Sequence, residues 1–120
     1  MNEVQAIKDR EHVERIKASL HGRDLLLFTV GINVGLRISD LLALKVGDLR
    51  GQDSVKVREG KTGKLRSLAL NDSVKVAVNT LLPADADASD YVFKSRNGVN
   101  KPISNVQVHR LLHAALERAG

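Results

Sequence analysis

The chain has 120 residues, a formal net charge of +5, only two phenylalanines and one tyrosine as aromatic residues, and no cysteine. This length suits one domain with one modest core, and the lack of cysteine excludes disulfides, thiolate zinc sites and a cysteine nucleophile. The scarcity of aromatic rings argues against binding of single-stranded nucleic acid, which uses such rings as stacking platforms.

Neither a membrane span nor a secretory leader is indicated. The longest nearly unbroken apolar stretch, residues 25–36, is twelve residues long, whereas a bilayer needs roughly 20. The residues after Met1 are charged and form no basic-then-apolar leader. We therefore expect a cytoplasmic protein with no membrane partner.

Two helices are predicted first along the chain. Val13, Ile16 and Leu20 recur at helical spacing and predict an amphipathic helix over residues 10–21. A second helix is predicted over residues 23–34, where apolar residues cover most of the circumference and therefore indicate burial.

A short third helix is predicted over residues 40–44. Ser39 is a good N-cap for it, and Asp40 would lie in its first turn, where a carboxylate interacts favourably with the helix dipole. We expect the helical region to end at residues 47–48, which are Gly-Asp.

A β-hairpin with a basic tip is predicted next. Residues 54–58 and 65–70 alternate in the manner of strands, and residues 59–64 form a glycine-bearing turn between them. Such a concentration of positive charge would attract phosphate, although charge alone favours an ordinary solvated hairpin. The basic residues of this region are Lys56, Arg58, Lys61, Lys64 and Arg66.

The last third of the chain predicts two more helices. The first is capped by Asn71 or Asp72 and runs to about residue 82, and residues 91–93 follow it as a short strand or extended segment before a turn at 97–98. The second opens at residues 104–107, which resemble a capping box. Its predicted buried face consists of Val108, Leu111, Leu112, Ala115, Leu116 and Ala119. The whole chain therefore predicts an α+β fold that is mainly α-helical, with a small two- to three-stranded antiparallel sheet.

Three apparent motifs do not carry chemistry. Residues 60–64, Gly-Lys-Thr-Gly-Lys, lack the flanking Gly and Ser/Thr of a phosphate-binding loop, so we expect no nucleotide partner. No acidic third ligand accompanies His109 and His113, which we interpret as exposed, so no metal site is predicted. Ser39 lacks a nearby histidine base and the nucleophile elbow.

Arg37 is the most informative charged residue. It lies between two apolar residues in Gly-Leu-Arg-Ile-Ser-Asp-Leu-Leu, residues 35–42, and a charge in such company is costly unless an anion meets it. A purely structural interpretation is that Arg37 pairs with Asp40 or covers helix carbonyls. Lys61, at the tip of the predicted hairpin, has the corresponding interpretation of an ordinary surface lysine.

That motif, followed by a strand, Gly-Lys-Thr-Gly-Lys-Leu-Arg at 60–66, a second strand and a helix, resembles the catalytic domain of the tyrosine recombinases, also called phage integrases. The resemblance extends over nearly the whole chain and includes the Val-Phe pair at 92–93. Its specific motif is Gly-Leu-Arg-x-Ser-Asp/Glu-Leu-Leu. It implies a single domain over residues 1–120 with the N-terminal part of the DNA breaking-rejoining catalytic fold.

The resemblance also implies roles for five residues. In that family the arginine of the motif contacts the scissile phosphate, and Arg37 occupies its place, with Asp40 bracing the active-site arginines. The hairpin lysine of the family maps to Lys61, which would protonate the 5′ oxygen that leaves the phosphate. Lys64 and Arg66 would then contact neighbouring phosphates. No metal or other cofactor is expected, because arginine and lysine supply the positive charge.

The sequence departs from the family pattern at its end. In the family a His-x-x-Arg motif and the nucleophilic tyrosine follow the closing helix, whereas this sequence ends at Gly120. Tyr91 lies too early and is assigned to packing. We therefore expect a partial catalytic domain that lacks its C-terminal segment. It would come from a protein that performs site-specific recombination or integration through a phosphotyrosine intermediate, and would be inactive alone.

The expected partner is double-stranded DNA, with self-association of the protein on it. Two other functions stay open. The first is a non-catalytic DNA-binding or regulatory module on the same scaffold. The second is a protein-interaction fragment whose closing helix offers an apolar face.

Overall fold

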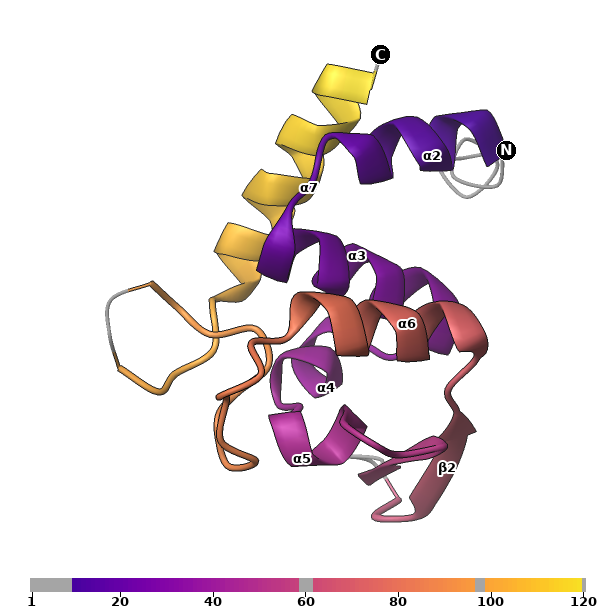
Figure 1. Cartoon of the computed structure of the whole chain (residues 1–120), viewed down its shortest axis with the longest axis vertical. Helices are drawn as coiled ribbons and strands as arrows, with labels where there is room; N and C mark the ends of the chain where they lie inside the picture. The colour runs from indigo at the N-terminus through magenta and orange to yellow at the C-terminus, as the bar shows by residue number, and fades with distance from the viewer. Residues whose placement is uncertain (1–9, 59–61, 97–98, 120) are drawn as a thin grey trace.

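The computed structural model describes residues 10–58, 62–96 and 99–119. Within these ranges it contains six helices and one two-stranded antiparallel sheet (Figure 1). The elements in chain order are α2 (Arg10–Ala18), α3 (Gly22–Val34), α4 (Ile38–Leu42), α5 (Val46–Leu49), β1 (Ser54–Arg58), β2 (Leu65–Ala69), α6 (Asp72–Leu81) and α7 (Asn105–Ala119). The predicted α+β class is confirmed.

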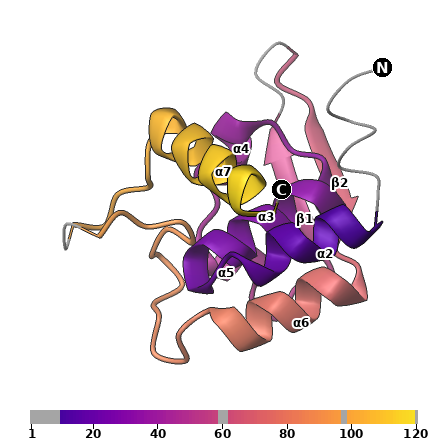
Figure 2. The ribbon, with the colours of Figure 1, turned by 90° about the horizontal axis from the view of Figure 1, so that it is seen from above.

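The helices separate the molecule into two ends. α3 and α6 pack side by side in the middle, and α2 packs against α7 at one end. Figure 1 shows α4, α5 and the β1–β2 hairpin together at the opposite end. Seen from above in Figure 2, α2 and α7 lie over α3. The elements that carry Arg37, Lys64 and Arg66 are therefore at the end away from α7.

Two clusters of buried side chains correspond to these ends. The main cluster joins α3, α4, α5, β1, α6, the segment before α7 and, through Val108, the start of α7. Its largest fully buried side chains are Phe93, Leu26, Leu27, Leu49 and Ile103. The second cluster lies between α2, α3 and α7 and consists of Ile16, Leu20, Phe28, Ala115 and Ala119. Burial of apolar area in the main cluster therefore holds α4 and the hairpin against α3 and α6.

Several helix ends follow directly from local sequence. α3 ends at Gly35, whose φ of 75° places it in the left-handed conformation that glycine adopts at low energy. Asn71 caps α6, because its side-chain oxygen accepts a hydrogen bond from Val74 N at 3.0 Å. At the start of α7, Gln107 N donates to Ser104 Oγ at 3.2 Å, and Ser104 N donates to Gln107 Oε1 at 3.0 Å. The predicted capping box is therefore confirmed.

Replacing Ser104 with Ala should destabilise the protein by about 1 kcal/mol, because an N-terminal amide of α7 then loses its acceptor. Urea unfolding followed by circular dichroism measures this change. Ser104→Thr keeps a hydroxyl acceptor and is the matched control. Equal unfolding midpoints for the Ala and Thr variants would contradict the role assigned to the hydroxyl.

The predicted start of the third helix is wrong. α4 begins at Ile38, with Arg37 and not Ser39 as its N-cap residue, and the Arg37 carbonyl accepts the first helical hydrogen bond from Leu41 N at 2.9 Å. Ile38 packs against the main cluster. This tertiary contact favours a helix that starts two residues earlier than predicted. Asp40 does lie in the first turn, as predicted.

The helical region also does not end at residues 47–48, because these residues belong to α5. Val46 N donates to the Asp90 carbonyl at 2.8 Å, and Gly47 N donates to the Ala88 carbonyl at 3.0 Å. The Asp48 carboxylate accepts a hydrogen bond from Lys45 N at 2.8 Å. The acceptors for the first amides of α5 thus come largely from a distant segment, which no local pattern reveals.

The predicted hairpin is confirmed over 54–58 and 65–69, with Val57 opposite Arg66 and Lys56 opposite Ser67. Residues 91–93 form no strand; Tyr91 makes only an isolated bridge with Lys45.

The remaining differences are small. The first predicted helix ends at residue 18 and not at 21. Leu116, predicted on the buried face of α7, is exposed. The predicted turn at 97–98 lies outside the described residues. Among the residues described, no helix combines the length and apolar character needed to cross a bilayer.

Candidate functional site

Arg37 projects from the junction between α3 and α4. Its neighbours Leu36 and Ile38 both pack against the main cluster, whereas the side chain of Arg37 is 62% exposed. The extended backbone of Arg37, with φ −67° and ψ 153°, lies between the two anchored residues. The junction therefore holds an arginine at the surface, and the desolvation cost that its apolar neighbours suggested does not arise.

Asp40 orients this arginine. Arg37 Nε lies 3.2 Å from Asp40 Oδ2, one helical turn further along the chain. An exposed ion pair of this kind contributes little to stability. Its effect is geometric, because it engages Nε, and no other bond of Arg37 is present within the described residues. The two terminal nitrogens of the guanidinium are thus open to a ligand such as a phosphate, which arginine can bind through two parallel hydrogen bonds.

The register of the hairpin divides its basic residues between two faces. Residues directly opposite each other share a face, so Arg66 shares one with Val57, which packs against the main cluster. Lys56 and Arg58 point to the other face. Lys64 is exposed just before β2, and its backbone N donates to Thr62 Oγ1 at 3.2 Å. Lys61 lies outside the described residues, so its proximity to Arg37 stays a prediction.

Arg58 is a residue whose role sequence reasoning missed. It was counted only as part of the basic stretch, but its Nη1 donates to the Gly63 carbonyl at 2.6 Å across the turn. Gly63 has φ 70°, a conformation that favours glycine. An arginine at the end of one strand, followed five residues later by a glycine, is a weak sequence signal for this link. The link joins the end of β1 to the residue before Lys64, ahead of the strand that carries Arg66.

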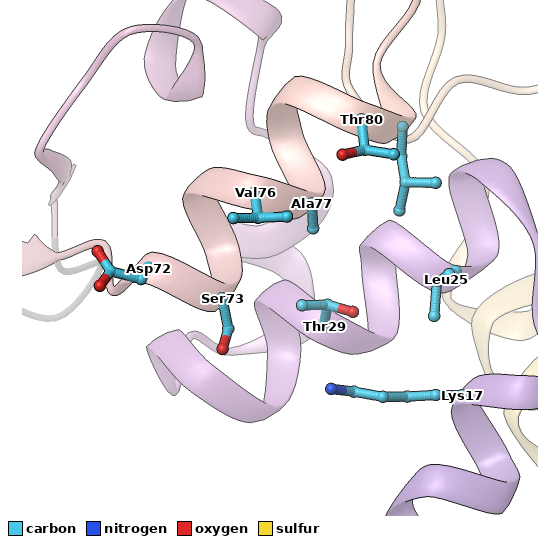
Figure 3. Close-up of a pocket in the computed structure, with 9 residues that line it drawn as sticks. Lys17, Leu25, Thr29, Asp72, Ser73, Val76, Ala77 and Thr80 are labelled. Atoms are coloured by element: carbon cyan, nitrogen blue, oxygen red, sulfur yellow. The ribbon is translucent and has the colours of Figure 1, made fainter.

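Two hollows among the described residues lie away from Arg37. One is a groove between α2, α3 and α6 with a volume of about 500 Å³. Figure 3 shows side chains that line it, among them Lys17, Thr29 and Val76. Neither Arg37 nor Asp40 lines it. Small-molecule sites are usually concave and enclosed, whereas the side chains of Arg37 and Lys64 are exposed. This arrangement suits a large substrate that lies across the protein.

Tyr91 lines a second cleft, of about 570 Å³, together with Arg23 and Lys94. Its ring centroid lies 5.2 Å from Lys45 Nζ, within the range of a cation–π contact. Arg37 is not among the residues that line this cleft. Tyr91 therefore lies in a cleft apart from Arg37, with its ring against Lys45.

His109 and His113 are exposed on the outer face of α7, as predicted. Within the part of the chain that the structure describes, no three His, Cys, Asp or Glu side chains gather in an arrangement that could hold a metal ion.

An exposed ion pair between α6 and the segment before β1 should make the stability of the protein depend on pH. Lys75 Nζ lies 2.7 Å from Asp53 Oδ1, and this hydrogen bond lowers the pKa of Asp53 from its ordinary 3.8 and raises the pKa of Lys75 from 10.5. A carboxylate with a depressed pKa contributes stability above its unfolded pKa and loses it as the pH falls through the folded pKa. The contribution is small because both groups face solvent.

Asp53→Asn should therefore slightly lower the thermal midpoint at neutral pH, and the difference from the parent should vanish as the pH falls below the ordinary range of Asp53. Midpoints measured from neutral pH down to strong acid test this expectation. A difference that persists at the lowest pH would mean that the variant acts through something other than charge.

Comparisons with known proteins give one family match and three relatives. The model of the phage integrase family matches residues 2–120. The chain is 37% identical over 123 aligned residues to the probable integrase/recombinase YoeC of Bacillus subtilis, covering 100% of this chain and 67% of that protein. It is 29% identical to tyrosine recombinase XerD of Caulobacter vibrioides and 31% identical to tyrosine recombinase XerA of Pyrococcus furiosus. These alignments cover 95% and 82% of this chain but only 42% and 35% of the two recombinases.

Proposed function

Because the chain belongs to the phage integrase family, we propose that it grips a phosphodiester of duplex DNA through Arg37 and the β1–β2 hairpin. It would do so as part of a protein that breaks and rejoins DNA for site-specific recombination or integration. The observation that carries this proposal is the surface position of Arg37, with its Nε engaged by Asp40 and its terminal nitrogens open. The exposed charge of Arg37 does not need a bound anion for the protein to fold. Its two terminal nitrogens are nevertheless placed so that they could donate parallel hydrogen bonds to a phosphate.

Arg37 would act by electrostatic stabilisation. Two parallel hydrogen bonds from the guanidinium to non-bridging phosphate oxygens become stronger as negative charge accumulates on those oxygens in the transition state. Asp40 is the positioning residue, because its carboxylate restricts rotation of the guanidinium about the side chain. In this role arginine replaces the positive charge that a metal ion supplies in many nucleases.

The hairpin would supply the second half of the site. Lys61 is assigned as the general acid that protonates the departing 5′ oxygen, while Lys64 and Arg66 contact phosphates beside the one that reacts. The link from Arg58 to Gly63 supports the hairpin's part in the site, because it ties the end of β1 to the residue before Lys64. The proposal for Lys61 depends on the family resemblance and on its place in the turn.

The covalent step would require a tyrosine other than Tyr91. Tyr91 is the single tyrosine of the sequence, and its ring lies over Lys45 in a cleft that Arg37 does not line. We therefore propose that residues 1–120 are part of a catalytic domain and bind DNA without cutting it. The same observation favours the second candidate function, a non-catalytic DNA-binding or regulatory module.

Titration of duplex binding against salt tests the proposal. Binding through phosphates predicts that the logarithm of the association constant falls linearly with the logarithm of salt concentration, with a slope of about −0.9 per phosphate contacted. Fluorescence anisotropy of labelled duplexes of two unrelated sequences should give similar slopes. Absence of binding at low salt would leave the DNA proposal without support and favour the protein-interaction fragment.

A nicked duplex that traps covalent intermediates tests the proposal that residues 1–120 bind DNA without cutting it. We expect no protein–DNA adduct on a denaturing gel from the 120-residue chain, and none from its Tyr91→Phe variant. An adduct that Tyr91→Phe abolishes would overturn the packing role of Tyr91. Sedimentation with and without duplex tests the further proposal that copies of the protein self-associate on DNA.

A further inference from the structure

A short chain of side-chain hydrogen bonds connects the end of α3 with the start of α6. Asn33 Nδ2 donates to the Thr29 carbonyl at 2.8 Å, and Asn33 Oδ1 accepts a hydrogen bond from Asn71 Nδ2 at 2.8 Å. Asn71 Oδ1 in turn accepts the hydrogen bond from Val74 N that caps α6. Both asparagines are therefore satisfied at donor and acceptor, which fixes the orientation of each amide.

Helix propensity does not explain Asn33. Asparagine is a poor residue inside a helix because its side chain competes for backbone groups, yet Asn33 occupies the last turn of α3 and is exposed. A hydrogen bond between two exposed side chains contributes little net stability, because water can replace either partner. The bond between Asn33 and Asn71 therefore has more consequence for position than for folding energy.

The hydrogen bond between Asn33 and Asn71 lies close in sequence to the α3–α4 junction that carries Arg37. Two residues after Asn33 the chain passes through Gly35 in the left-handed conformation, with no heavy atom within 4 Å of the place a Cβ would occupy. No side chain packs over Gly35 itself, whereas Val34 and Leu36 on either side of it pack against the main cluster. Arg37 follows two residues later. Leu36 anchors the junction on the core side, while Asn33 anchors the end of α3 on the α6 side.

Asn71 is equally well placed on the other half of the site. It follows β2 by two residues, and β2 is the strand that carries Arg66. The bond between the two asparagines thus joins the segment that leads into Arg37 to the segment that leaves the hairpin. We propose that Asn33 and Asn71 are a positioning pair that sets the placement of Arg37 relative to the hairpin. This inference rests on the proposed function, because it concerns how the same site meets DNA.

Two uncharged variants break the bond from opposite sides. Asn33→Ala removes the acceptor, and Asn71→Ser keeps a hydroxyl cap for α6 but is too short to reach Asn33. Each should weaken duplex binding by about threefold to tenfold, the range expected for loss of coupling between residues in contact. Asn79→Ala is the matched control, because Asn79 is an exposed asparagine in α6. It should bind DNA as the parent does.

The decisive measurement repeats both variants in an Arg37→Ala background. If the asparagines act through Arg37, their effect on duplex affinity should largely disappear there, while the small effect on the unfolding midpoint should persist. Equal losses of affinity in both backgrounds, or no loss in the parent background, would overturn the positioning role. If Arg37→Ala itself leaves affinity unchanged, it is the proposed phosphate site that fails.

Discussion

Phe93→Ala is expected to destabilise the protein by about 3 to 5 kcal/mol, a large share of the roughly 5 to 15 kcal/mol by which domains are usually stable. Phe93 is fully buried in the main cluster. Its carbonyl accepts a hydrogen bond from Ile103 N at 2.9 Å, which joins the two sides of the segment before α7. Loss of the ring would leave a cavity, and the tightly packed side chains around it could not move enough to fill it. Urea unfolding, with an unchanged dependence on urea concentration, measures the difference.

Phe28→Ala is the informative comparison, because Phe28 belongs to the second cluster and is slightly exposed. We expect a smaller loss than for Phe93, since a site between α2, α3 and α7 can relax more easily. Phe93→Leu should recover part of the loss because it restores most of the volume. A loss below about 1 kcal/mol for Phe93→Ala would contradict its place at the centre of the core.

Elements governed by local rules were predictable from sequence. The capping box at Ser104 and Gln107 depends on two side chains three residues apart, and the αL end of α3 depends on one glycine. The hairpin followed from alternation on both sides of a turn, and the two strands pair antiparallel over 54–58 and 65–69. The motif around Arg37 led to the family, because its residue order is specific even though no single residue in it is.

Elements governed by distant contacts were not predictable. α5 depends on the carbonyls of Ala88 and Asp90, which lie some forty residues further along the chain. The exposure of Arg37 depends on Leu36 and Ile38 both packing inward, so that their apolar character anchors the arginine and does not surround it. The hydrogen bond between Asn33 and Asn71 joins positions that no sequence spacing relates. The pairing of Arg37 with Asp40 was therefore predictable from sequence, but the distant contacts that place Arg37 at the surface were not.

Arg37→Ala should lower duplex affinity by about tenfold to a hundredfold, the range for removing charge-assisted hydrogen bonds from a bound phosphate. The slope of the salt dependence should fall by about 0.9, the contribution of one phosphate. Folding should be unaffected, because the side chain is 62% exposed and its one ion pair faces solvent. Anisotropy titrations at several salt concentrations, with unfolding midpoints measured in parallel, give both quantities.

Variants of Arg37 and Asp40 distinguish the effect of hydrogen-bond geometry on DNA binding from the effect of charge. Arg37→Lys keeps the positive charge but cannot form two parallel hydrogen bonds, so it should retain most of the salt slope while losing part of the affinity. Asp40→Asn leaves Arg37 in place and removes the carboxylate that holds its Nε. It should weaken binding even though the protein becomes more positive, which is opposite to the effect expected from net charge. Arg110→Ala, at an exposed arginine on α7, controls for the loss of one positive charge. If Arg110→Ala and Arg37→Ala weakened binding equally, DNA would be attracted to the whole basic surface and Arg37 would have no special place in it.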